Sequence, residues 1–132
     1  MKTNALFTVL LVVMVALAAG CETPGSWQSK IAGTYPGSIF NDPEEYPSTT
    51  TFKFDKGKLS GTFELEVDGT TIDGNLREFA VTGERKLKCR WINYEQRAGD
   101  FNMTFSPDLS SFKGNWVPDD QNGSGAWNGK KK

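Results

Sequence analysis

The chain has 132 residues, with 15 lysines and arginines, 16 aspartates and glutamates, and a formal net charge of −1. This balance gives no electrostatic basis for binding nucleic acid, which favours a surplus of positive charge. The sequence contains no histidine, so it lacks the commonest general base and the commonest neutral metal ligand.

The chain begins with one positive charge and a short apolar segment. Lys2 precedes an apolar run from Ala5 to Ala19 that only Thr8 interrupts. The run has about 15 residues, whereas a helix that crosses a bilayer needs about 20. A positive start, a short apolar centre and small residues before a cleavage point are typical of a secretory signal peptide. We therefore predict that residues 1–20 form a signal peptide that is removed.

The end of this run has the pattern of a lipid attachment site. The stretch Leu17-Ala18-Ala19-Gly20-Cys21 resembles the lipobox of bacterial lipoproteins, in which small residues precede an invariant cysteine, although the leucine stands one position early. The resemblance implies that Cys21 carries a diacylglycerol and an N-acyl chain such as palmitate, which together anchor a protein stably to a membrane. Glu22, in place of aspartate, implies sorting to the outer membrane. A signal peptide cut after Ala19 or Gly20, leaving a free thiol, is the alternative.

The sequence after Cys21 predicts a short tether, residues 21–29, and a single antiparallel β domain, residues 30–132. Apolar and polar residues alternate with a period of two, most clearly from Leu59 to Val67. Turn signals such as Asp68-Gly69 separate the runs. A change of parity near Arg77-Glu78 predicts a β-bulge. The expected strands cover residues 30–36, 49–54, 59–67, 70–81, 85–94, 99–105, 110–117 and 125–130.

A glycine repeat indicates how the strands are arranged. A glycine is followed two residues later by a large apolar residue at Gly33/Tyr35, Gly61/Phe63, Gly74/Leu76, Gly99/Phe101, Gly114/Trp116 and Gly125/Trp127. Small residues beside large ones on one face let a strongly curved sheet coil while its interior still fills. We therefore predict an all-β fold, an antiparallel up-and-down β-barrel of about eight strands, with a two-sheet β-sandwich as the alternative. The pattern is similar to that of avidin-type and lipocalin-like barrels, which implies the architecture and no particular ligand.

Two regions are candidates for binding. The first is the barrel interior, either an apolar cavity or a packed core. Its candidate lining residues are Tyr35, Phe63, Trp91, Phe101, Trp116 and Trp127. The second is the segment Asn41–Pro47, expected to be an irregular loop with Asp42, Glu44, Glu45 and Tyr46 as contact residues, or else a solvated connector. Cys89 is expected to be a buried core residue rather than a nucleophile, because no base partner is evident.

No arrangement of residues predicts catalysis, a metal site or a cofactor. The sequence therefore favours a non-enzymatic protein, held by its lipid at the bacterial cell envelope, that binds a hydrophobic small molecule or an envelope protein. The alternative is a periplasmic inhibitor or structural accessory lipoprotein, in the manner of the small lipoproteins that block lysozyme.

Overall fold

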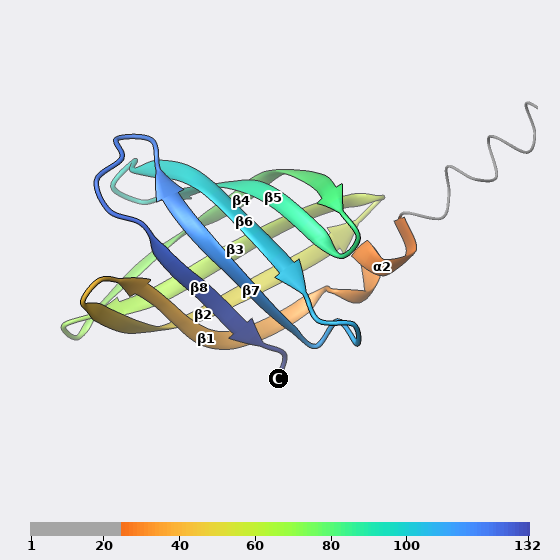
Figure 1. Ribbon diagram of the computed structural model, residues 1–132, viewed down its shortest axis with the longest axis horizontal. Helices are drawn as coiled ribbons and strands as arrows, with labels where there is room; N and C mark the ends of the chain where they lie inside the picture. The colour runs from red at the N-terminus through yellow and green to blue at the C-terminus, as the bar shows by residue number, and fades with distance from the viewer. Residues whose placement is uncertain (1–24) are drawn as a thin grey trace, which may run out of the picture.

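The computed structural model describes residues 25–132, so the predicted signal peptide and the lipidation site at Cys21 lie outside the described residues. It is a closed barrel of eight antiparallel strands in which each strand pairs with the next and the last pairs with the first (Figure 1). This confirms the predicted up-and-down barrel, and the sandwich alternative is wrong. The elements are α2 (Gly25–Lys30), β1 (Gly33–Asn41), β2 (Glu44–Asp55), β3 (Lys58–Val67), β4 (Thr70–Gly83), β5 (Lys86–Asn93), β6 (Ala98–Phe105), β7 (Ser111–Pro118) and β8 (Gly125–Lys130).

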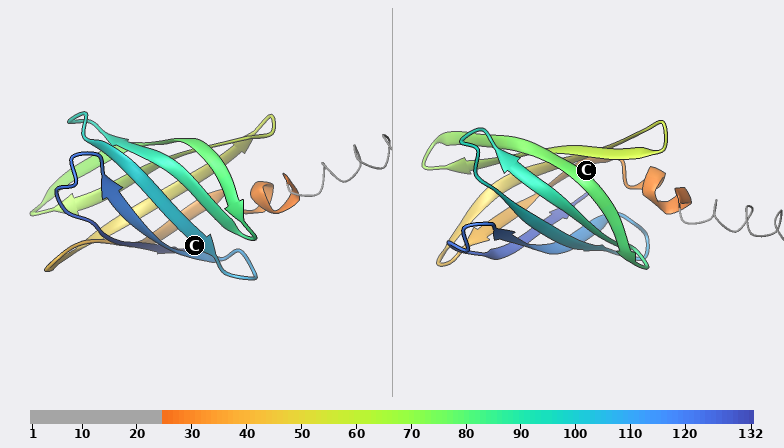
Figure 2. Two further views of the ribbon diagram at one scale, coloured as in Figure 1. Left: turned by 45° about the horizontal axis from the view of Figure 1, so that its top comes forward. Right: turned by 90° about the horizontal axis from the view of Figure 1, so that it is seen from above.

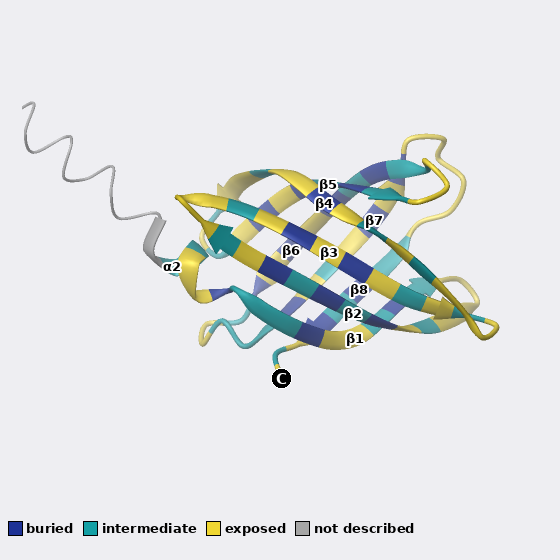
Figure 3. Ribbon diagram, turned by 180° about the vertical axis from the view of Figure 1, so that it is seen from behind, coloured by how far each residue is buried: buried dark blue, intermediate teal, exposed yellow. Residues whose placement is uncertain are grey.

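The alternation of apolar and polar residues places one face of each strand inside the barrel. Buried and exposed positions alternate along β2 and β3 in Figure 3. The tight turns agree with the twist of the strands they join. Asp68 and Gly69 have φ angles of 51° and 81°, and Lys56 and Gly57 have 51° and 78°. Positive φ at both central residues is the conformation that matches the right-handed twist of a hairpin.

The predicted bulge in β4 is confirmed. Pairing of β4 with β5 shifts between Arg77 and Ala80, and Glu78 between them has a φ of 58°. The extra residue changes which side chains face inward, so the ring of Phe79 lies 6.1 Å from the ring of Phe52 in the interior. Val81, which continues the same parity and pairs with the buried Leu87, is 46% exposed near the end of β4.

The glycine repeat has a direct structural cause. Large inward side chains lie opposite inward glycines on the next strand: Phe63 pairs with Gly74, Trp91 with Gly99, and Trp116 with Gly125. A Cβ atom at Gly74 would lie 2.6 Å from the Phe63 ring, and one at Gly99 would lie 2.8 Å from the Trp91 indole nitrogen. Each glycine therefore makes the space that a ring on the neighbouring strand occupies.

The expectation of an irregular loop over Asn41–Pro47 is wrong. Strand β1 continues to Asn41 and β2 begins at Glu44, so only Asp42 and Pro43, joined by a cis peptide bond, connect them. Proline is tolerated here because this part of β2 pairs with β1 alone: the register of β2 with β3 begins at Ser48, one residue after Pro47. Proline is compatible with a strand where one side has no partner.

The two ends of the barrel differ. We call the end where α2 packs the closed end; the connections 56–57, 84–85 and 106–110 lie there (Figure 2). The opposite end, with the connections 42–43, 68–69, 94–97 and 119–124, is called the open end. The ring of Trp27 in α2 lies 6.4 Å from that of Phe105, and the ammonium of Lys131 donates to the carbonyl of Lys30 over 3.0 Å. Residues 25–30 thus form a helix packed on the barrel, and the segment 21–29 predicted to be a lipidated tether includes most of this helix. Within residues 25–132 no helix has the length and apolar character needed to cross a membrane.

Candidate ligand cavity

The interior next to the closed end is filled by aromatic rings. Tyr35, Phe52, Phe105 and Phe112 contact one another with ring centroids 5.4–6.0 Å apart. The Tyr35 hydroxyl donates to the carbonyl of Ile31 over 2.8 Å, and burial raises the pKa of Tyr35 to about 12. Edge-to-face contacts of this kind pack tightly and add to the gain from burial. This half of the barrel is therefore a packed core.

The interior next to the open end contains a cavity of about 240 Å³. The rings of Phe63 and Trp127 form its base, and those of Trp91 and Trp116 lie nearer the opening. Aliphatic side chains from β1, β3 and β4 form much of the wall. Polar groups occur where the strands end. The lining residues are Ile39, Asn41, Tyr46, Phe63, Leu65, Val67, Ile72, Trp91, Asn93, Arg97, Trp116 and Trp127. A dry engineered cavity of about 150 Å³ takes up benzene, so this volume suffices for one ring system or a short branched chain.

The base of the cavity is held in place by stacking and hydrogen bonds. Trp127 stacks on Phe101 with centroids 4.0 Å apart and 6° between the planes, and its indole N–H donates to the Thr50 hydroxyl over 2.9 Å. Phe63 meets the edge of Trp127 at 5.0 Å. Because the rings and the polar atom fix one another, the base is preformed rather than shaped by a ligand.

A pair of tryptophans lines the cavity near its opening. Trp91 and Trp116 meet edge to face at 5.9 Å, and the Trp116 indole N–H donates to the carbonyl of Phe40 over 2.8 Å. The indole N–H of Trp91 is buried and has no hydrogen-bond acceptor within residues 25–132. Because this nitrogen has almost no accessible surface, a ligand in the cavity cannot reach it, and a donor buried without an acceptor costs free energy.

Two arginines fix the loop 119–124 beside the opening. Arg97 lies 5.9 Å from the centroid of the Trp116 ring, has its Nε 3.4 Å from a carboxylate oxygen of Asp120, and donates to the carbonyl of Asn122. Arg90 on β5 bonds Asp100 over 2.9 Å and Asp119 over 2.8 Å. These contacts lower the pKa of Asp119, chiefly through its hydrogen bond to Arg90. The loop is therefore tied to the barrel by charge-assisted bonds.

The structure separates the residues predicted for the interior site. Phe63, Trp91, Trp116 and Trp127 line the cavity, whereas Phe101 lies behind Trp127 and Tyr35 belongs to the closed-end core. Sequence reasoning missed the rim residues Asn41, Asn93 and Arg97, because residue type and period place a side chain inside or outside a barrel but not along its axis.

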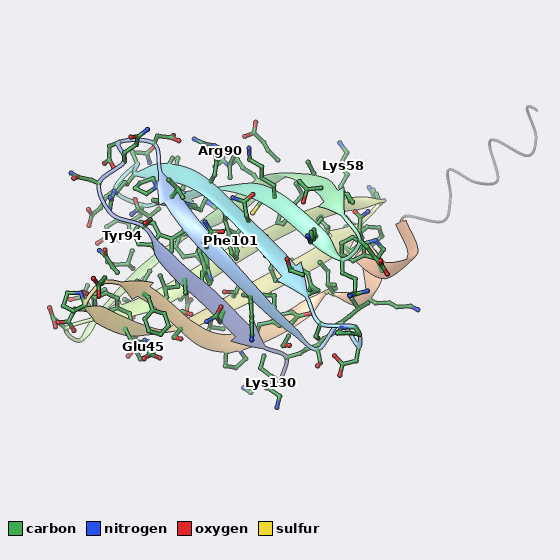
Figure 4. The ribbon with its side chains drawn as sticks, in the orientation of Figure 1. Glu45, Lys58, Arg90, Tyr94, Phe101 and Lys130 are labelled. Carbon is green, nitrogen blue, oxygen red and sulfur yellow. The ribbon has the colours of Figure 1, made fainter. Side chains whose placement is uncertain are left out.

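The residues predicted to form a contact loop lie in two different places. Asp42 is in the two-residue turn, and Glu44 and Glu45 are exposed at the start of β2. Tyr46 on the same strand lines the cavity. Figure 4 shows Glu45 at the open end, far from Lys58 at the closed end.

The remaining candidate groups in residues 25–132 are the carboxylates and the thiol of Cys89. Within residues 25–132 no group of three or more cysteine, aspartate or glutamate side chains is placed to hold a metal ion. Cys89 is buried in the core as predicted, and burial raises the pKa of its thiol, with a further contribution from Asp100. A thiol kept protonated in this way is a poor nucleophile.

No protein-family model and no curated protein matches this chain.

Proposed function

We propose that this barrel is a non-enzymatic binding domain that takes a hydrophobic small molecule into the cavity at its open end. The observation that carries the proposal is the cavity of about 240 Å³, which has a preformed aromatic base while the other half of the interior is packed. Most small-molecule sites are concave, mainly apolar and largely preformed, with few polar groups that orient the ligand. The cavity has each of these properties.

The charges around the cavity favour an uncharged ligand. Arg97 is the one ionised side chain among its lining residues, and it is already paired with Asp120. Exposed carboxylates stand nearby, including Glu44 and Glu45 at the start of β2. An anionic compound such as a fatty acid would be repelled by these carboxylates, and the one arginine in the cavity wall is already paired. The ligand we infer is a neutral compound with one or two ring systems.

Two related dyes test this proposal. 1-N-phenylnaphthylamine is neutral, and 8-anilinonaphthalene-1-sulfonate adds a sulfonate to the same ring skeleton. We expect the neutral dye to bind in a one-to-one ratio with increased fluorescence, and the sulfonate to bind at least about tenfold more weakly, a difference of about 1.4 kcal/mol. At a hundred times its Kd the neutral dye should stabilise the fold by about 2.7 kcal/mol.

Leu65→Trp should abolish dye binding, because it places a bulky ring in the cavity from β3. Its matched control is Glu64→Trp on the same strand, where the side chain is exposed. Equal binding by both variants would place the dye outside the cavity. Failure of the native protein to bind either dye would favour the alternative role as an inhibitor or structural accessory in the envelope.

We also propose that the domain is anchored to the bacterial envelope by acyl chains on Cys21. The residues before Cys21 support this, since they resemble a lipobox. Helix α2 begins at Gly25, four residues later, and four extended residues span at most about 14 Å. The anchor would therefore hold the closed end near the bilayer and leave the open end facing away. Radiolabelled palmitate should be incorporated into the native protein and not into Cys21→Ser; equal labelling of both would refute the site.

A further inference from the structure

The two ends of the barrel carry opposite charge, although the chain as a whole is almost neutral. Basic residues gather at the closed end and in the strand halves beside it: Lys30, Lys53, Lys56, Lys58, Arg85, Lys86, Lys88, Lys113, Lys130, Lys131 and Lys132. Acidic residues gather at the open end: Asp42, Glu44, Glu45, Glu64, Glu66, Asp68, Asp73, Glu95, Asp100, Asp119 and Asp120. Figure 4 labels Lys58 and Glu45 at the opposite ends.

Few charges of the minority sign offset this separation, and the two groups meet near the middle of the barrel, where the Lys88 ammonium lies 3.8 Å from the Asp100 carboxylate. The acidic residues at the closed end are Asp55, Glu84 and Asp108, and Glu84 is paired with Arg85 over 2.9 Å. Toward the open end the basic residues Arg90 and Arg97 are both held in ion pairs with carboxylates, and in the middle of β4 the exposed neighbours Arg77 and Glu78 carry opposite charges. Net charge therefore conceals a strong electrostatic polarity along the barrel axis.

The closed-end lysines are available to a partner. Lys56, Lys58, Lys86 and Lys130 are exposed, and within residues 25–132 no carboxylate lies within ion-pair distance of them. Lys131 donates to the carbonyl of Lys30, a neutral partner, so its positive charge stays uncompensated at the same end. These lysines lie in or beside the connections 56–57 and 84–85 and at the end of the chain, and Figure 1 shows α2 on the same side of the barrel as these two connections.

We propose that the closed end is a docking surface for an anionic membrane, with acidic phospholipid headgroups as its partner. A basic surface near such a membrane gains about fivefold in affinity for each lysine that reaches it. Helix α2, the first described element, lies at this end, so an N-terminal anchor and the basic surface would engage the same bilayer. The acidic open end is repelled, which orients the barrel with its cavity directed away from the membrane. The proposal does not depend on whether the cavity holds a ligand.

Vesicle sedimentation with the full chain carrying Cys21→Ser tests the surface without the contribution of acyl chains. Vesicles of phosphatidylcholine with about a third phosphatidylglycerol should bind the protein at low salt, and vesicles of phosphatidylcholine alone should not. Binding should disappear near 1 M salt, because the Debye length is then only about 3 Å and the attraction between lysines and headgroups is screened. No binding to the anionic vesicles at low salt would overturn the proposal.

Charge-matched variants separate a local surface from net charge. Neutralising the closed end with Lys56→Gln, Lys58→Gln and Lys86→Gln should weaken binding by about a hundredfold, taking about fivefold for each lysine. The control is Thr70→Glu, Thr71→Glu and Ser124→Glu, which lowers the net charge by the same amount at exposed open-end positions. We expect the control to bind almost as the native sequence does. An equal loss in both would show that net charge alone acts, and would refute the docking surface.

A fluorescent label reports the orientation directly. Cys89 is buried, so in the Cys21→Ser background a new exposed cysteine can be labelled selectively. Asp55→Cys at the closed end and Glu66→Cys at the open end each remove one negative charge. Lipids bearing a quencher should reduce the fluorescence of the label at residue 55 and leave that at residue 66 unchanged. Equal quenching at both positions would contradict the proposed orientation. Because no dye enters the cavity in these experiments, their outcome is separate from that of the ligand proposal.

Discussion

The role of the inward glycines can be tested by comparing two glycines of the same strand, β4. A Cβ atom at Gly74 would lie 2.2 Å from the carbonyl oxygen of Ile92 and 2.6 Å from the ring of Phe63. At Gly83 the nearest atom is the Lys86 Cδ at 3.2 Å, which belongs to a flexible side chain. Neither glycine has a positive φ. The two alanine variants therefore differ in the available space rather than in backbone strain.

The expected magnitudes follow from these contacts. Overpacking costs about 1–3 kcal/mol, and Gly74→Ala should be at the upper end because a paired backbone cannot shift without disturbing its ladder. The gain from restricting the unfolded chain is about 0.4–1 kcal/mol and applies to both variants. We expect Gly74→Ala to lower the free energy of unfolding by about 2 kcal/mol, which reduces Tm by about 10 °C or more. Gly83→Ala should leave stability unchanged or raise it slightly.

Urea denaturation followed by tryptophan fluorescence measures both values. A difference below about 1 kcal/mol between the variants would refute the argument that the glycines accommodate neighbouring rings. Adding Phe63→Leu to Gly74→Ala should recover only part of the loss, because the contact with the Ile92 carbonyl remains. A double-mutant cycle isolates this coupling between the two positions.

Three further outcomes follow from the interior and the loops. Thr50→Val removes the acceptor of the Trp127 indole N–H and should lower the free energy of unfolding by about 1–3 kcal/mol in the same assay; an unchanged value would show that the N–H finds another partner. Hydrogen bonds from Ser106 and Ser110 lower the pKa of Asp108 to about 2, so its contribution to stability is present at neutral pH and is lost as pH falls from about 4 through 2. Asp108→Asn should flatten the dependence of Tm on pH in that range, and identical slopes would contradict this. Cys89 should react with a thiol reagent only at the rate of unfolding, since its side chain is buried, and fast reaction in the native state would refute this.

The strand pattern could be predicted because a barrel imposes a strict period of two. Most inward residues are apolar or glycine, as from Leu59 to Val67, and the change of parity at Arg77 and Glu78 correctly predicted the bulge. The glycine repeat predicted closure for a sound physical reason, since rings fill the space that glycines leave on the next strand. These features depend on local sequence and on neighbouring strands alone.

Other features depend on contacts that local sequence does not report. Helix α2 has six residues, too few for a recognisable helical period, and Trp27 packs against Phe105, far away in the chain. Pro43 and Pro47 predict an irregular loop over Asn41–Pro47, because proline usually interrupts strands. That Pro47 lies beyond the pairing of β2 with β3 could be known only from the register.

The charge polarity illustrates how topology gives meaning to sequence. In an up-and-down barrel, successive connections alternate between the two ends. Lys56 and Arg85 are in connections at one end, and Asp68, Glu95 and Asp119 are in connections at the other. Along the sequence these charges simply alternate and appear mixed. Once the strand order is known, the same residues separate into a basic end and an acidic end.

The position of the cavity along the barrel is determined by the size of the inward side chains. Near the closed end the inward positions hold aromatic rings such as Tyr35, Phe52 and Phe105. Near the open end, β3 and β4 present Leu65, Val67 and Ile72, which fill less volume. Packing defects that arise by chance are small and scattered, because protein interiors are close-packed. Here the smaller residues are grouped on two adjacent strands, above a base held by stacking and hydrogen bonds. That grouping is the strongest physical reason to treat the cavity as a binding site rather than as imperfect packing.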